Sequence, residues 1–103
     1  MRRAPHPKEA RLYALRVPPH LADLIRNLHP RLKRKLRETL KTIVADPPSG
    51  KAFKDELAGL WSFRVGKFRV IYRIGANRRI ELIAFGPRER IYEETFRLIT
   101  REK

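Results

Sequence analysis

The spacing of apolar residues changes once along this chain, and that change constrains the fold more than any other feature. Between residues 21 and 44, apolar side chains recur every three or four positions, which is the repeat of an amphipathic helix. Between residues 61 and 85 they alternate with polar side chains or form short aromatic and β-branched runs, which favours strands. Separate helical and strand-rich halves are typical of an α+β fold.

The first half predicts one strand and two helices. The strand covers residues 12–17 and ends at Pro18, because proline removes a ladder donor and fixes φ. Helices are expected over residues 21–28 and 30–44. Since few residues join them, they should form an antiparallel hairpin.

The second half predicts three strands and a closing helix. The strands cover residues 61–65, 68–74 and 79–85, and short turns between them favour an antiparallel meander. The helix covers residues 89–100, with three apolar side chains on one side: Tyr92, Phe96 and Ile99. The expected order is β-α-α-β-β-β-α, with the helical hairpin packed on an antiparallel β-sheet.

A length of 103 residues suits one domain. Residues 1–10 contain two prolines and no apolar repeat, so they are predicted to be a flexible basic N-terminal arm. The remaining residues, 11–103, are predicted to form the single folded domain.

The charge of the chain points to a polyanionic partner. It carries 25 Lys and Arg against 11 Asp and Glu, a formal net charge of +14. Basic side chains crowd the second predicted helix, where they favour a nucleic-acid footprint over the alternative of a merely solvated face. We name as candidate RNA contacts from this helix Arg34, Lys35, Arg37 and Lys41.

Several classes of protein are excluded by what the sequence lacks. It has no cysteine, which excludes disulfides and thiolate catalysis and suits a cytoplasmic protein. No apolar run approaches the roughly 20 residues that span a bilayer, so no membrane partner is expected. It has neither a glycine-rich phosphate loop nor histidines at metal-ligand spacing. We therefore expect no metal and no small-molecule cofactor.

The strand alternation gathers arginines on one face of the sheet. Arg69 points away from the helices, and Ser62 and Arg64 on the neighbouring strand share its face. Arg88, Arg90 and Tyr92 follow the last strand and could curl round to the same side. Guanidinium groups bind phosphate in a bidentate manner, and a tyrosine ring can stack on an unpaired base. The alternative is that an arginine-rich chain places arginines there by chance.

One stretch of the sequence resembles a known toxin family. The pattern L-x-G-x-W-x-x-R-x-G-x-F-R-V-I-Y covers residues 57–72, and R-x-R-x-Y follows at residues 88–92. Both resemble the RelE/ParE superfamily of type II toxin–antitoxin toxins, and the β-α-α-β-β-β-α order agrees. In its RelE-like branch the implied activity is a metal-independent, ribosome-dependent mRNA endoribonuclease that inhibits translation.

The resemblance also implies roles for individual residues. The 2′-hydroxyl of the RNA attacks the adjacent phosphate, leaving a 2′,3′-cyclic phosphate. Arg69 would bind the scissile phosphate, Arg88 would stabilise the transition state, and Tyr92 would stack on or orient the substrate. The family's basic strand pair falls on Ser62 and Arg64, where this sequence departs from two lysines. The titratable amine could then come from Lys67 or Lys54, and further RNA contacts are expected from Lys54 and Arg90.

The missing lysine pair leaves other functions open. One alternative is a ParE-like DNA gyrase inhibitor that leaves transcripts intact, and another is a nucleic-acid-binding domain with no toxicity. Both toxin readings imply a cognate antitoxin protein with acidic character. The nuclease reading adds the ribosome and mRNA as partners.

Overall fold

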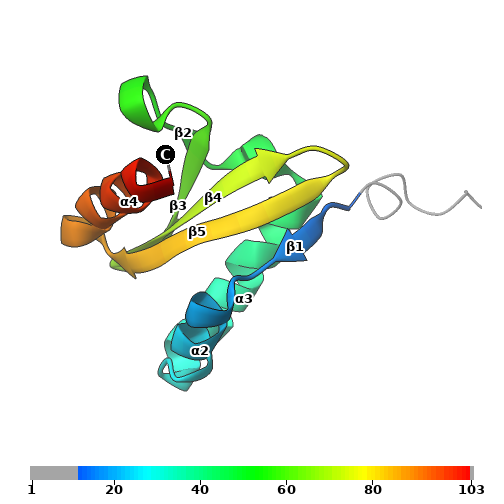
Figure 1. Ribbon diagram of the computed structural model, residues 1–103. Helices are drawn as coiled ribbons and strands as arrows, with labels where there is room; N and C mark the ends of the chain where they lie inside the picture. Colours follow the sequence, from blue (N-terminus) through cyan, green and yellow to red (C-terminus); the bar gives the residue numbers. More distant parts are fainter. Residues whose placement is uncertain (1–11, 103) are drawn as a thin grey trace, which may run out of the picture.

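Helices lie on both faces of a five-stranded sheet in the computed structural model, which describes residues 12–102 (Figure 1). The strands are β1 (Ala14–Arg16), β2 (Lys51–Ala52), β3 (Leu60–Val65), β4 (Phe68–Gly75) and β5 (Arg79–Pro87). The helices are α2 (Pro19–Arg26), α3 (Pro30–Ala45) and α4 (Arg88–Glu102), with single 3-10 turns at η1 (Pro47–Ser49) and η2 (Asp55–Leu57). None of the helices within residues 12–102 is both long and apolar enough to cross a membrane.

The predicted α+β class and the order of the main elements are confirmed, with two additions to the sheet. Its strand order is β1-β5-β4-β3-β2, and β1 pairs parallel to β5, so the sheet is mixed rather than wholly antiparallel. The two-residue strand β2 extends the other edge. The pairing of β1 could not be predicted, because alternation of apolar residues indicates a strand but not its neighbour. Strand β2 could not be predicted, because two residues are too few to show alternation. The predicted arm, residues 1–10, lies outside the described residues.

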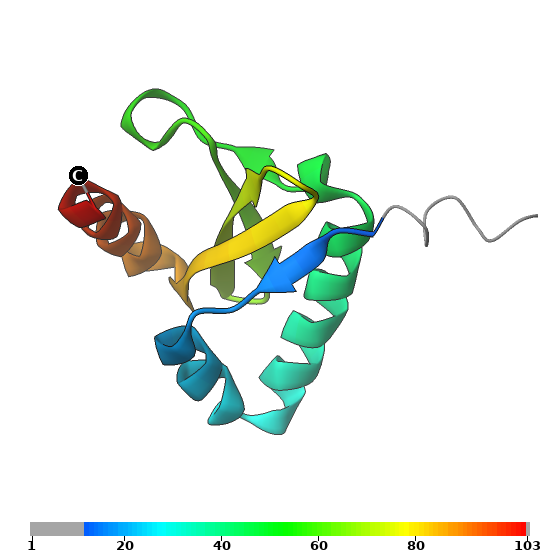
Figure 2. The same ribbon diagram turned by 45° about the vertical axis from the view of Figure 1, so that its right-hand side comes forward.

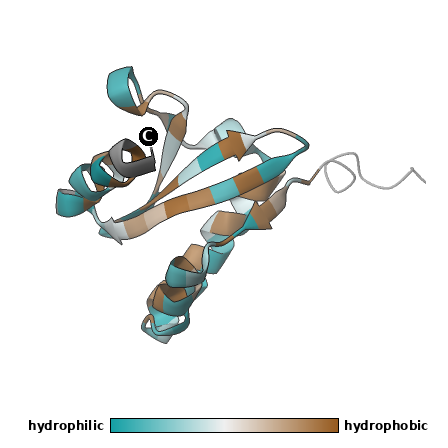
Figure 3. Cartoon of the chain, in the orientation of Figure 1, coloured by the Kyte–Doolittle hydropathy of each residue, from teal (hydrophilic) through white to brown (hydrophobic). Residues whose placement is uncertain are grey.

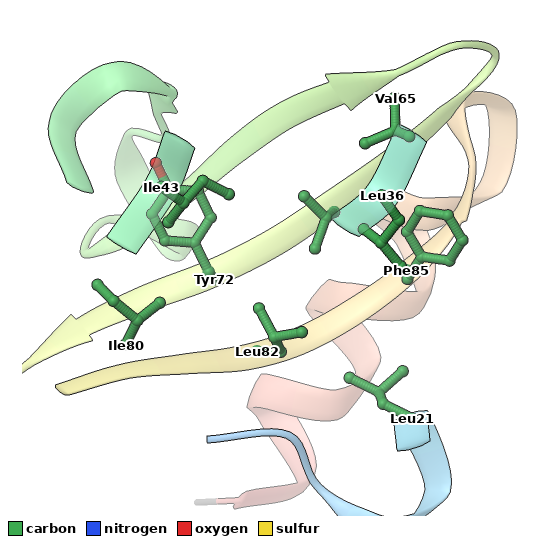
Figure 4. Close-up of a cluster of buried hydrophobic side chains, with 9 residues drawn as sticks. Leu21, Leu36, Ile43, Val65, Tyr72, Ile80, Leu82 and Phe85 are labelled. Carbon is green, nitrogen blue, oxygen red and sulfur yellow. The ribbon is translucent and has the colours of Figure 1, made fainter. Parts of the chain in front are cut away.

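One face of the sheet carries the larger apolar core. Figure 2 shows α4 and the α2–α3 hairpin on opposite sides of the sheet, and the hairpin covers this face. Its buried side chains come from both helices and all three long strands (Figure 4): Leu21, Leu36, Ile43, Val65, Val70, Tyr72, Ile80, Leu82 and Phe85. Each such side chain stabilises the fold by about 1.5–3 kcal/mol relative to its exposed state. The predicted packing of the hairpin on the sheet is therefore confirmed.

Tyr72 fixes the segment that leads from α3 into the sheet. Its ring is fully buried, its hydroxyl donates to the carbonyl oxygen of Pro47, and it accepts a hydrogen bond from the Gly50 amide at 3.1 Å. Burial raises the pKa of Tyr72 above its usual value. The Tyr72 hydroxyl thus pairs with two backbone groups of the segment between α3 and β2, the Pro47 carbonyl and the Gly50 amide.

The other face of the sheet is covered by α4 and by η2. Its core is smaller and comprises Leu60, Ile71, Ile83, Ala84 and Ile91. A β-bulge lies here, because Tyr72 pairs with Leu82 while Ile71 pairs with Ala84, which leaves Ile83 unpaired. Figure 3 shows the contrast between apolar strands and the largely hydrophilic helix α4.

Tyr92, Phe96 and Ile99 share one side of α4, as their spacing predicts, but the two aromatic residues do not face the core. Ile91 and Thr95 are fully buried instead, whereas Tyr92 is 36% and Phe96 47% exposed. The buried stripe lies about 100° around the helix from the predicted one. Thr95 is polar, so hydropathy alone favoured the neighbouring aromatic stripe.

Candidate anion-binding active site

Arg69, on β4, is held by Ser62 of the neighbouring strand β3. The alternation of β4 directs Val70 into the hairpin core and Arg69 to the opposite face. One guanidinium nitrogen of Arg69, Nη1, donates to Oγ of the buried Ser62 at 2.9 Å. The hydrogen bond orients the guanidinium and leaves its remaining N–H groups available to a ligand.

A hollow of about 330 Å³ opens beside Arg69, at the end of the β3–β4 hairpin. It is lined by Arg64, Gly66, Lys67, Phe68, Arg69 and Arg88. The first residue of α4 joins this group through its backbone, because the Arg88 amide donates to the carbonyl oxygen of Lys67 at 3.1 Å. Four of the five predicted catalytic residues therefore meet in one hollow: Arg64, Lys67, Arg69 and Arg88.

The electrostatics of this hollow favour an anionic ligand. Every charged residue that lines it in the described part of the chain is a cation. Arg64 and Arg69 are directly opposite on neighbouring strands, where like charges repel each other. The buried Nε of Arg69 finds no hydrogen-bond acceptor among the described residues. A phosphate bound in the hollow would offset the repulsion between these guanidinium groups.

Tyr92, the fifth predicted catalytic residue, does not line this hollow. It lies on α4, one turn beyond Arg88, and its ring meets the ring of Phe53 edge to face with centroids 5.4 Å apart. Sequence reasoning missed Phe53, because the segment after β2 has no clear repeat. A single aromatic residue between lysines is the signal that could have drawn attention to it.

The predicted RNA contacts on α3 fall into different surroundings. Lys35 reaches towards the site, since a methyl group added at Gly66 would lie 3.9 Å from its Nζ atom. Arg37 instead lines an apolar hollow between α2 and α3. Lys41 forms an exposed ion pair with Glu38 at 3.8 Å, and Arg34 is exposed.

The two remaining predicted contacts are exposed on the α4 side of the molecule. Lys54 directly precedes η2, which packs against α4, and Arg90 lies in the first turn of α4. Neither lines the hollow around Arg69. Lys35 therefore lies beside the β3–β4 turn, whereas Lys54 and Arg90 lie outside the hollow.

Side chains suited to metal binding are not grouped here. Among the residues whose side chains the structure describes, no three His, Asp or Glu side chains lie close enough together to hold a metal ion. His29 has a structural role, because its Nδ1 accepts a hydrogen bond from the Arg31 amide at 3.0 Å and caps α3. The chemistry that this site can support by its own groups is charge stabilisation and proton transfer.

The fold is that of the RelE/ParE superfamily of type II toxin–antitoxin toxins. Residues 12–92 match a family model described as the ParE toxin of the type II toxin–antitoxin system parDE. The chain belongs to this ParE toxin family. No curated protein matches the chain.

Solved toxin structures have the same fold. The RelBE2 toxin–antitoxin complex from Mycobacterium tuberculosis contains a chain 26% identical to this one, with a TM-score of 0.65, and the match covers 75% of this chain and 99% of that one. A mutant of E. coli RelE in the free state, in which two arginines are replaced by alanine, is 14% identical to this chain with a TM-score of 0.71. The match covers 88% of this chain and 97% of that one. The RelE–RelB complex of Pyrococcus horikoshii contains a chain 22% identical to this one, with a TM-score of 0.64. The match covers 77% of this chain and 98% of that one.

Proposed function

We propose that this toxin is an endoribonuclease that cleaves mRNA on the ribosome and so inhibits translation. The observation that carries the proposal is the cationic hollow, in which Arg64, Arg69 and Arg88 surround a space of about 330 Å³. The hydrogen bond from Nη1 of Arg69 to Ser62 Oγ orients the guanidinium, whose other terminal nitrogen can donate to a phosphate oxygen.

The proposed reaction is an internal transesterification. The 2′-oxygen of one nucleotide forms a bond to the adjacent phosphorus, and the bond from phosphorus to the 5′-oxygen of the next nucleotide breaks. Negative charge builds up on the phosphoryl oxygens in the transition state, where Arg69 and Arg88 stabilise it. The products are a 2′,3′-cyclic phosphate and a 5′-hydroxyl.

Proton transfer requires a group other than the arginines. A guanidinium keeps its proton at neutral pH and does not accept one from the 2′-hydroxyl. Lys67 is the lysine that lines the hollow, so we assign it to proton transfer with the 2′-hydroxyl. Arg88 hydrogen-bonds to the departing 5′-oxygen, which takes up a proton from solvent water to become the 5′-hydroxyl. Arg64 contributes positive charge.

The proposal includes a cognate antitoxin. Two of the solved relatives described above are toxin–antitoxin complexes. A net charge of +14 favours a partner with acidic segments, because the cations it covers must be paired when they lose water.

A second candidate function is inhibition of DNA gyrase. The observation that favours it lies on β3, where Ser62 is buried and holds Arg69 instead of presenting an amine. A toxin of this kind would stop growth and damage DNA while transcripts stay intact.

The experiment is inducible expression without antitoxin, followed by primer extension on abundant transcripts. We expect cuts within translated codons for the wild type and for Arg79→Ala, and none for Arg69→Ala. Arg79 is a matched control, because it is an exposed arginine at the other end of the β4–β5 hairpin. Growth arrest with intact transcripts would favour gyrase, and unimpeded growth would favour a binding domain with no toxicity.

A further inference from the structure

Ser62 is a buried serine whose hydroxyl serves the site rather than the core. Apart from the Tyr72 hydroxyl, the buried polar side chains among those that the structure describes are Ser62 and Thr95. Burial of a hydroxyl is unfavourable unless the hydroxyl is hydrogen-bonded. Thr95 has no partner among the described residues, whereas Ser62 accepts a hydrogen bond from Arg69. The burial of Ser62 is therefore linked to the guanidinium of Arg69.

Strand pairing on both sides holds the backbone of Ser62. It pairs with Lys51 of β2 and with Ile71 of β4. Gly50 packs closely against it as well, since a Cβ atom at Gly50 would lie 2.7 Å from the carbonyl oxygen of Ser62. A serine side chain has one torsion between its backbone and its oxygen, so a fixed backbone leaves Oγ few positions. The two-residue strand β2 thus helps to fix the hydroxyl that Arg69 contacts.

The guanidinium of Arg69 is constrained at two of its three nitrogens. Nη1 donates to Ser62 Oγ at 2.9 Å, and Nε is buried. Any turn of the guanidinium plane would break the hydrogen bond to Ser62. Nη2 is then the nitrogen that a phosphate oxygen in the hollow would contact. Ser62 therefore determines which edge of Arg69 the ligand meets.

A lysine at the position of Arg69 could not perform both tasks. Its amine is a single nitrogen at the end of a flexible chain, whereas a guanidinium has separate nitrogens in a rigid plane. Arginine can donate to Ser62 through one nitrogen and to a phosphate through another. The pair of residues explains why arginine is required here, beyond its positive charge.

We propose that Ser62 is a positioning residue for the cleavage reaction and acts by directing Nη2 of Arg69 at the phosphate in the transition state. It neither touches the RNA nor takes a proton, although the family resemblance places a lysine at this position. The position of a donor matters most when charge builds up on the phosphoryl oxygens. This inference rests on the proposed ribonuclease function and adds to it a residue that acts through Arg69.

The test is a double-mutant cycle between Ser62→Ala and Arg69→Lys. Single-turnover cleavage of mRNA on programmed ribosomes is measured over a range of toxin concentrations, below the unfolding transition of each variant. Ser62→Ala should lower the maximal rate about 10- to 100-fold. It should leave the toxin concentration for half-maximal rate unchanged, because the misplaced donor acts in the transition state. In the Arg69→Lys background, Ser62→Ala should cause no further loss.

The pH dependence of cleavage separates positioning from proton transfer. A serine hydroxyl that only holds Arg69 does not change its protonation during the reaction. Ser62→Ala should therefore lower the rate by the same factor at every pH and keep the shape of the profile. A profile of different shape would assign Ser62 to proton transfer and overturn the positioning role.

Thr95→Val is the matched control. Valine has the shape of threonine without its hydroxyl, and the Thr95 hydroxyl is buried without a partner among the described residues. The variant should cleave as the wild type does, since it removes a buried hydroxyl from the same side of the sheet without affecting Arg69. Thermal unfolding of every variant records the change in stability separately.

Each outcome supports or overturns the role of Ser62. Wild-type cleavage together with undiminished cleavage by Ser62→Ala overturns it and leaves the ribonuclease function intact. Equal losses from Ser62→Ala with arginine and with lysine at position 69 also overturn it, because Ser62 then acts on the fold alone. If Ser62→Ala does not fold, Ser62→Cys replaces it in the cycle, since a thiol is of similar size and a weak acceptor. A wild-type protein that cuts no mRNA overturns the proposed function and the role of Ser62 with it.

Discussion

The two faces of the sheet use neighbouring residues of the same strands for different purposes. Towards the hairpin, Val70 and Tyr72 are fully buried, and the one polar group among them, the Tyr72 hydroxyl, is paired with backbone. Towards α4, Arg69 lies among other cations and keeps a buried nitrogen without an acceptor. The polar group on the hairpin face is fully hydrogen-bonded, whereas Arg69 on the α4 face keeps one nitrogen without an acceptor. Stability and function should therefore respond separately to substitutions at adjacent positions.

The largest expected effect comes from Arg69→Ala. Removing a group that stabilises transition-state charge should lower mRNA cleavage by about 10²- to 10³-fold. The free energy of unfolding should fall by about 1 kcal/mol or less, because relief of the repulsion from Arg64 partly offsets the loss of the hydrogen bond to the buried Ser62. Single-turnover cleavage and denaturant unfolding measure the two effects.

The neighbouring substitution Val70→Ala is the matched control. It removes fully buried methyl groups from the hairpin core and should cost about 2 kcal/mol of stability. Its cleavage rate, measured well below the unfolding transition, should remain near that of the wild type. Equal losses of cleavage in both variants would contradict the separation of the two faces.

On the hairpin face, the largest loss of stability is expected for Gly50→Ala. A Cβ atom there would lie 2.5 Å from the Tyr72 hydroxyl oxygen and 2.7 Å from the carbonyl oxygen of Ser62. Since the second neighbour is backbone, the strand must shift, at a cost of about 3 kcal/mol. Thermal unfolding measures it, and an unchanged melting temperature would show that the segment around η1 can move freely.

A smaller loss is expected for Tyr72→Phe. The variant leaves the Pro47 carbonyl and the Gly50 amide without their partner, which should cost about 1–2 kcal/mol. The pKa of Tyr72 is raised by burial above 10.0, so the unfolded state releases this proton first as pH rises. Its contribution to stability is complete below pH 10 and is lost as pH rises through the folded pKa.

That pH dependence gives Tyr72→Phe a second readout. Above pH 10 the wild type should lose stability more steeply than the variant, as measured by urea unfolding at a series of pH values. Comparison with the variant cancels the titration of the other tyrosines and of the lysines. Parallel curves for the two proteins would contradict a neutral, buried Tyr72 hydroxyl.

The smallest effect is expected at the far end of the sheet. Glu81 pairs with Arg16 at 3.3 Å and with Arg73 at 2.9 Å, but these side chains are all at least one-third exposed. Glu81→Gln should therefore cost about 0.5 kcal/mol or less, and high salt should reduce even this difference. Cleavage should not change, since Glu81 does not line the hollow around Arg69.

Much of the fold could be predicted because local patterns determine it. The helical repeat of Leu36, Leu40 and Ile43 places α3, and the strict alternation around Arg69 assigns its face. The elements that were missed depend on tertiary contacts. Thr95 is buried by the packing of α4 rather than by its own hydropathy, and the parallel pairing of β1 depends on where the hairpin returns the chain.

The candidate site follows the same division. Arg64, Arg69 and Arg88 could be predicted together, because strand alternation and a family resemblance both pointed to them. The position of Tyr92 outside the hollow could not be predicted. Its ring contacts the ring of Phe53, which is 39 positions away along the chain. The approach of Lys35 to the β3–β4 turn is likewise a contact between distant segments.

The most direct test of the account uses a programmed ribosome and a single change in the substrate. A synthetic mRNA is prepared with either a ribose or a 2′-deoxyribose immediately 5′ of the scissile phosphate, and single-turnover cleavage by the wild-type toxin is measured. The account predicts that the ribose substrate is cut to a 2′,3′-cyclic phosphate and a 5′-hydroxyl, and that the deoxyribose substrate stays intact. Cleavage of both substrates would contradict attack by the 2′-oxygen, and cleavage of neither, together with inhibited gyrase supercoiling, would contradict the ribonuclease function.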